Sequence, residues 1–133
     1  MSQENVDLLR RAYEHVNRTT EFLPEAAHPD LVWDTTTFRD AMTTDTCVGI
    51  EETNEWLAEW LENFDNWSIS IEEVFEAGDR LVTIVHQRAS PKHGGPEVQM
   101  YLAQVWTFQD GLVARMEMYA DRGDALEAAG LSE

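Results

Sequence analysis

The hydrophobic residues change their spacing after residue 66, and this change limits the chain to very few folds. Before it, apolar residues recur at helical spacing. After it, residues 67–71 alternate apolar with polar, and runs rich in β-branched and aromatic residues follow over 81–89, 98–108 and 112–120. The second half of the chain therefore predicts four consecutive β-strands.

Turn signals separate these four runs. Gly78-Asp79 and Asp110-Gly111 are typical of tight hairpin turns, and residues 90–96, with two Pro and two Gly, predict a looser tip. Connections this short join neighbouring strands in antiparallel orientation. We therefore expect an antiparallel meander.

The first half of the chain predicts mostly helix. We expect a helix over 3–18, a short helix over 20–27, a strand over 31–37, a loop over 38–49 with a short strand near Cys47 and Val48, and a helix over 51–64. A last short helix begins with a capping box at Asp124 and Glu127 and ends at Gly130. Because helices and strands are segregated along the chain, we expect an α+β fold with the helices on one face of a curved antiparallel sheet.

Composition narrows the possible functions. The 133 residues suit one domain over 1–133, and 43% hydrophobic residues suffice for an ordinary core. The net charge of −17 repels phosphate backbones and acidic headgroups, so we expect neither a nucleic-acid nor a membrane partner. The first residues lack the basic and apolar runs of a signal peptide, which favours a cytoplasmic protein. Cys47 is the only cysteine, so we expect a buried thiol without a disulfide.

Several segments, in this order, are similar to those of a known family. They are 9–13 with Asn17, 28–30 leading to Trp33-Asp34, Gly49-Ile50, 77–80, 104–108 before Asp110-Gly111, and Asp121-Arg122 to Leu131. With them, the chain resembles the SnoaL-like branch of the nuclear transport factor 2-like superfamily over nearly its whole length. The resemblance implies a cone-shaped α+β barrel, the fold of ketosteroid isomerase. In that fold the sheet wraps around the N-terminal helices, and a ligand lies against its concave face.

The resemblance also implies which side chains face the pocket. Aligned with ketosteroid isomerase in sequence order, the inward set is Val32, Asp34, Thr36, Val82, Ile84, His86, Arg88, Leu102, Gln104, Trp106, Phe108, Met116 and Met118. Trp33 and Tyr119 then fall on the outer face of the sheet. Large apolar groups there favour a homodimer, which is common in this superfamily.

Four residues are candidate catalytic groups. Asp34 matches the general-base aspartate of ketosteroid isomerase, and Gln104 stands where that enzyme has an oxyanion-hole aspartic acid. Tyr13 lies one residue from the register of its oxyanion tyrosine, and His86 would polarise or orient the substrate. Alternatively, Asp34 only caps the first strand, and His86 and Arg88 form a solvent-facing pair at the far end of a hairpin.

An aromatic and thioether wall completes the expected site. The candidate ligand-binding residues are Trp56, Trp60, Ile84, Arg88, Trp106, Met116 and Met118. Their aromatic and thioether members are equally consistent with plain core. No two of the four His have the spacing of metal ligands on a helix, so we expect no metal, and the chemistry that the resemblance implies needs no cofactor.

Two functions remain open. In the first, the protein holds a small hydrophobic carbonyl compound and acts as a cofactor-free isomerase, cyclase or hydrolase, with Asp34 as the base. In the second, it is a noncatalytic ligand-binding or dimerisation module. The two hypotheses differ in whether Asp34 and His86 line one connected cavity. Epoxide hydrolysis, as in relatives of limonene epoxide hydrolase, needs an Asp-Arg-Asp arrangement that the sequence does not place.

Overall fold

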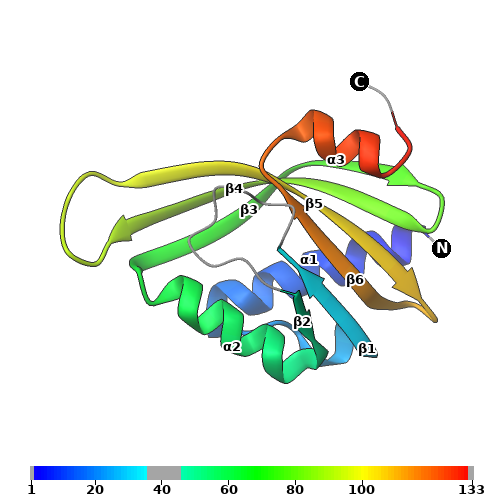
Figure 1. Ribbon diagram of the computed structural model, residues 1–133, viewed down its shortest axis with the longest axis horizontal. Coiled ribbons are helices and arrows are strands. Elements are labelled where there is room, and N and C mark those ends of the chain that lie inside the picture. Colours follow the sequence, from blue (N-terminus) through cyan, green and yellow to red (C-terminus); the bar gives the residue numbers. More distant parts are fainter. Residues whose placement is uncertain (1, 36–45, 132–133) are drawn as a thin grey trace.

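The computed structural model describes residues 2–35 and 46–131 (Figure 1). Its helical elements are α1 (Ser2–Thr19), the 3-10 turn η1 (Pro24–Ala26), α2 (Gly49–Leu61) and α3 (Arg122–Ala128). Its strands are β1 (Ala27–Asp34), β2 (Thr46–Val48), β3 (Phe64–Ala77), β4 (Arg80–Pro91), β5 (Val98–Gln109) and β6 (Leu112–Tyr119). Residues 38–45, which make up most of the loop expected over 38–49, lie outside the described residues.

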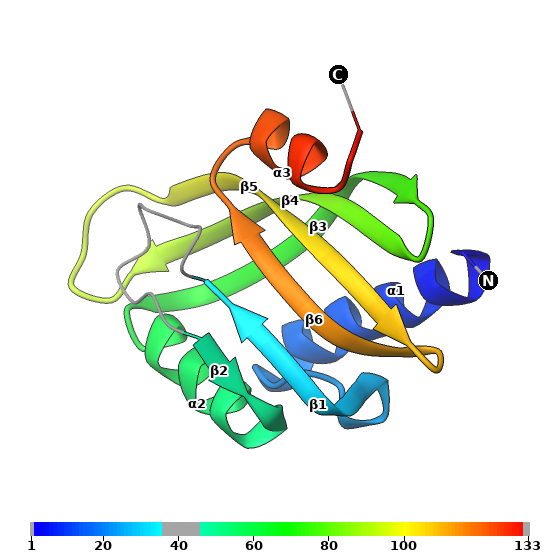
Figure 2. The same ribbon diagram turned by 45° about the vertical axis from the view of Figure 1, so that its right-hand side comes forward.

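The six strands form one curved sheet in the order β2-β1-β6-β5-β4-β3 (Figure 2). The predicted meander of β3 to β6 is confirmed, because each of its neighbouring pairs is antiparallel. At the last hairpin, Asp110 and Gly111 both have positive φ, at 56° and 76°, which a tight two-residue turn between twisted strands requires. The sheet is not wholly antiparallel, since β1 runs parallel to β6.

The helices cover both faces of the sheet, whereas we expected them on one. In Figures 1 and 2, α1 and α2 lie on the concave side and α3 lies on the convex side. Each side has its own hydrophobic core, a large one under α1 and α2 and a smaller one under α3. Strand β4 lies between the two cores, and its residues 81–85 are therefore all buried.

The expected helix over 20–27 is replaced by the single turn η1. Pro24 begins this turn, and the preceding Leu23 is extended, because a following proline disfavours the helical region. Asn54 of α2 accepts a hydrogen bond from the backbone N–H of Phe22 at 2.9 Å. This contact attaches the segment between α1 and η1 to α2, and the side chain of Phe22 lies in the core.

Asn17 attaches α1 to the edge strand β3. Its side-chain amide donates to the carbonyl oxygen of Ile69 at 2.9 Å and accepts from the Ile69 N–H at 2.9 Å. Asn17 thus pairs with the outer edge of β3 as a neighbouring strand would. With this end of the helix fixed, Tyr13, one turn earlier, points at the concave face of the sheet.

Candidate functional site

A cavity of about 40 Å³ lies between the concave face of the sheet and helices α1 and α2. All five tryptophans of the chain line it, and we call it the tryptophan cavity. The lining residues are Ala12, Tyr13, Val16, Phe22, Trp33, Trp56, Leu57, Trp60, Trp67, Ile69, Gln87, Gln104, Trp106 and Met118. Of these, Trp67 on β3 is the only one that is not buried, which places the rim of the cavity there.

A chain of hydrogen bonds runs along one wall of the tryptophan cavity. The indole N–H of Trp106 donates to Thr83 Oγ1 at 2.9 Å, and Thr83 Oγ1 lies 2.8 Å from the Tyr13 hydroxyl. Tyr13 in turn donates to Gln104 Oε1. Because the single hydroxyl proton of Tyr13 is donated to Gln104, the Thr83 hydroxyl is the donor to Tyr13. Both hydroxyl groups of this hydrogen-bond chain therefore have an acceptor.

Burial raises the pKa of Tyr13 well above its ordinary value, although its polar contacts with Thr83 and Trp106 act in the opposite direction. The phenol therefore stays protonated at neutral pH. It keeps its proton for Gln104 and does not act as a base.

Gln87 on β4 forms a second polar point on the wall. Its Oε1 accepts the indole N–H of Trp67 at 2.7 Å and that of Trp60 at 3.4 Å. An indole nitrogen can only donate, so these bonds orient the amide with its oxygen toward the tryptophans. Gln87 and Thr83 were not among the residues predicted from the sequence, although a polar residue within an otherwise apolar strand was a signal that could have found them.

Six of the predicted site residues do line the cavity. They are Tyr13, Gln104, Trp56, Trp60, Trp106 and Met118. Met116 is fully buried in the same core but is not among the lining residues. The inward face expected for β5 and β6 is confirmed by this arrangement, since Leu102, Phe108 and Met116 belong to the concave core.

The expected orientation of Asp34 is wrong. The parallel register sets Trp33 beside Met116 of the core and Asp34 beside Glu117, so Trp33 faces the cavity and Asp34 the opposite side. There Asp34 Oδ2 accepts a charged hydrogen bond from Arg115 Nη2 at 2.7 Å. Thr36, which was expected to share its face, lies outside the described residues.

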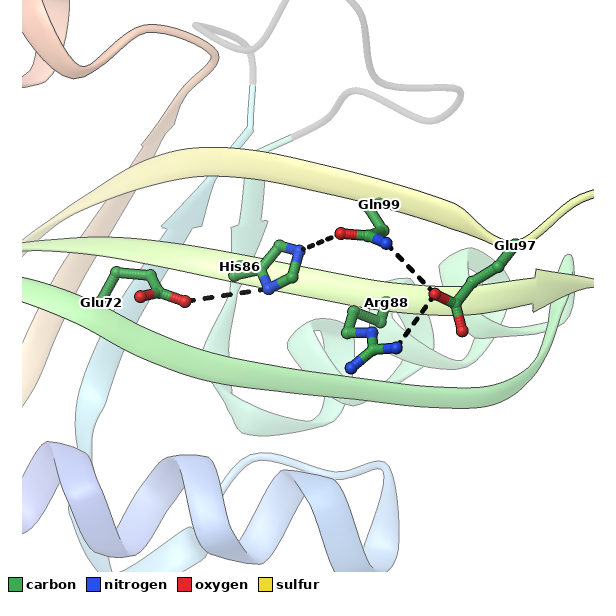
Figure 3. Close-up of polar contacts among 5 residues, drawn as sticks. All are labelled: Glu72, His86, Arg88, Glu97 and Gln99. Carbon is green, nitrogen blue, oxygen red and sulfur yellow. Dashed lines mark hydrogen bonds and ion pairs between the residues drawn. The ribbon is translucent and has the colours of Figure 1, made fainter.

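The expected orientation of β4 is also wrong. Ile84 packs in the smaller core with Leu126 of α3, on the convex side. His86 and Arg88 lie on the same side, in the polar cluster that Figure 3 shows across β3, β4 and β5. His86 Nε2 lies 3.0 Å from Gln99 Oε1 and stacks on the Tyr101 ring at 4.4 Å.

The remaining contacts of this cluster explain why it faces outward. His86 Nδ1 lies 3.8 Å from Glu72, and Arg88 donates to Glu97 at 3.1 Å, with both partners partly exposed. Alternation assigns a strand to a face only when one face is polar. Apart from Thr83, residues 81–85 are apolar on both faces, so their alternation does not assign a face, and the alignment with ketosteroid isomerase gave the wrong one.

Three further properties concern the part of the chain that the structure describes. Within it, no three His, Cys, Asp or Glu side chains are grouped in a way that could hold a metal ion. No helix in it is long and apolar enough to cross a membrane. The side chain of Cys47 is buried, as predicted.

A curved sheet with two helices on its concave face defines the cone-shaped α+β class of folds. The SnoaL-like domain model matches residues 9–116, and the chain belongs to this family. No curated protein sequence matches the chain significantly.

Solved structures agree with this fold. The chain is similar to TerC crystallised with polyporic acid, at 22% identity and a TM-score of 0.76 over 96% of this chain and 98% of TerC. It is also similar to a nuclear transport factor 2-like protein of Burkholderia pseudomallei, at 21% identity and a TM-score of 0.75, covering 93% and 95% of the two chains. A ketosteroid isomerase-like protein of Catenulispora acidiphila, in complex with trimethylamine, matches at 17% identity and a TM-score of 0.70, covering 91% of each chain.

The ion pair of Asp34 with Arg115 predicts the sign of a stability change. Asp34→Asn removes the charge that Arg115 pairs with, and we expect the free energy of unfolding to fall by about 1 kcal/mol, a value reduced by the partial exposure of Arg115. Urea unfolding at neutral pH measures the change, and Asp30→Asn, at a side chain that is 90% exposed, is the control. A gain in stability would instead indicate an unpaired, desolvated carboxylate.

Tyr13 predicts a loss of stability at high pH. The unfolded chain ionises this phenol near pH 10 while the folded chain keeps it protonated, so the unfolded state binds fewer protons and stability falls as pH rises above about 10, by up to about 1.4 kcal/mol per pH unit. Urea unfolding between about pH 8 and pH 11 should show a steeper decline for the wild type than for Tyr13→Phe. Parallel declines would contradict the assignment.

Proposed function

We propose that this protein binds one small, uncharged and largely apolar molecule in the tryptophan cavity. The observation that carries the proposal is that all five tryptophans, together with Phe22 and Met118, surround this one cavity. Trp56 and Trp60 stack at 5.9 Å with nearly parallel rings and present a flat wall. Aromatic walls of this kind are typical of sites for hydrophobic ligands.

Binding without proton transfer is the function that the geometry supports best. Among the described residues, neither a carboxylate nor an imidazole lines the cavity. Asp34 and His86, which acid/base chemistry would need in one cavity, both lie on the opposite face of the sheet. Tyr13 and Gln104 therefore serve to orient the ligand, and Trp56, Trp60, Trp106 and Met118 form its walls.

The cavity volume sets the scale of the ligand. About 40 Å³ exceeds the roughly 10–15 Å³ that one water needs and is below the roughly 150 Å³ of an apolar cavity that accepts benzene. A ring-sized ligand thus requires a lining side chain to move. The flexible thioether of Met118 and the rim residue Trp67 are placed to do so.

Tryptophan fluorescence tests the proposal, because no tryptophan lies outside the cavity wall. We expect toluene to change the emission in a saturable way and to raise the free energy of unfolding by about 1.4 kcal/mol at ten times its dissociation constant. Ala12→Leu adds a larger side chain at the lining and should abolish both effects. Ala58→Leu, on the exposed face of α2, is the matched control and should keep them.

The result that would contradict the proposal is equally direct. If toluene changes neither emission nor stability in the wild type and in Ala58→Leu, the cavity does not accept a ring-sized apolar molecule. If Ala12→Leu binds toluene as the wild type does, the site lies elsewhere.

We further propose that the protein forms a homodimer through the convex face of the sheet. Tyr101 on β5 is 62% exposed and is stacked on His86, which places an exposed aromatic ring on this face. Trp33 is no part of that surface, because it lies in the cavity. Light scattering should give twice the chain mass at moderate salt, and Tyr101→Glu should give the monomer mass. A monomeric wild type at low and at moderate salt would contradict the proposal.

A further inference from the structure

Trp33 carries a buried hydrogen-bond donor that has no acceptor among the described residues. Its side chain is 4% exposed and lines the tryptophan cavity, and among the described residues no acceptor pairs with its indole Nε1. An indole N–H removed from water without a partner costs about 1–3 kcal/mol. Native structures rarely leave such a group unpaired unless it has a use.

The ring of Trp33 lies among the other rings of the wall. Its centroid is 5.5 Å from that of Phe22, 5.8 Å from that of Trp106 and 6.5 Å from that of Trp56. All three of these residues line the same cavity. Trp33 therefore forms part of the aromatic wall that a ligand in this cavity would contact.

The other polar groups of the cavity wall can also act as hydrogen-bond donors toward a ligand. The oxygen of Gln104 accepts from Tyr13, and the oxygen of Gln87 accepts from Trp60 and Trp67. Because both amide oxygens accept hydrogen bonds from the protein, the NH₂ group is the part of each glutamine that can pair with a ligand, and it can only donate. The hydroxyl protons of Tyr13 and Thr83 already form hydrogen bonds within the protein, to Gln104 and to Tyr13 respectively. The wall therefore offers donors.

We propose that Trp33 is the specificity-determining donor of this site, and that its indole N–H binds a neutral acceptor oxygen of the ligand, of the carbonyl class. The inference rests on the proposed function and adds to it what the ligand must carry. A carboxylate or phosphate is disfavoured because no cationic side chain lines the cavity among the described residues, and a buried charge without a partner is costly. A ligand that can only donate would leave the Trp33 N–H unpaired.

Cyclohexanone and methylenecyclohexane test this, because they share a ring and differ only in an oxygen against a CH₂ group. We expect both to bind, and Trp33→Phe to weaken cyclohexanone about tenfold more than it weakens methylenecyclohexane. Trp60→Phe is the matched control, since the Trp60 N–H already donates to Gln87, and it should affect both probes alike.

A second measurement uses the unmodified chain. In ¹⁵N-labelled wild type, the indole N–H signal of Trp33 should move downfield with cyclohexanone and stay in place with methylenecyclohexane. This readout keeps the test decisive if Trp33→Phe folds poorly.

The outcomes separate the two proposals. If both probes bind, but Trp33→Phe weakens them equally or cyclohexanone leaves the Trp33 signal in place, the donor role of Trp33 is overturned while ligand binding stands. Binding of methylenecyclohexane or toluene without binding of cyclohexanone also overturns it. If toluene and both probes fail to bind, the proposed function itself fails.

Discussion

The packing of Trp106 is the interaction on which the rest of the structure depends. This residue is 2% exposed and lies in the second half of β5. The centroid of its ring lies 6.0 Å from that of Tyr13 on α1, 6.0 Å from that of Phe22 between α1 and η1, and 5.8 Å from that of Trp33 on β1. One residue thus fixes the distance of the first helix, the connection and the first strand from the sheet. Its N–H also begins the chain of hydrogen bonds that ends at Gln104.

Because large rings set these distances, they cannot fill the space between them completely. Flat indoles meet edge to face or stacked, and their rigid shapes leave the tryptophan cavity where α2 faces the sheet. The polar groups on its wall pair with one another and leave donors over, while Trp33 has no partner among the described residues. The size of the site, its apolar lining and its hydrogen-bond donors all follow from the same few side chains.

The convex face of the sheet is covered by α3 along only part of its length. Under α3 it is apolar, and beyond α3 it becomes the polar cluster of His86, Arg88, Glu97 and Gln99. The strand β4 changes its character along its length because only its first half is covered on both sides. Groups that suggest acid/base chemistry in the sequence are thereby kept away from the cavity.

The sequence by itself determined the α+β class, the order of the elements, the meander and its turns, because hydrophobic period and turn chemistry are local properties of the chain. It also brought Tyr13, Gln104 and Trp106 into one candidate site. Only the tertiary structure decided which face of β1 and β4 looks inward. A single position separates Trp33 from Asp34, and the outcome depends on the parallel register with β6 and on α3 covering the convex side, contacts between distant segments. For the same reason the sequence does not predict that the Trp33 N–H lacks an acceptor among the described residues, since this depends on the surroundings of the residue and not on its type.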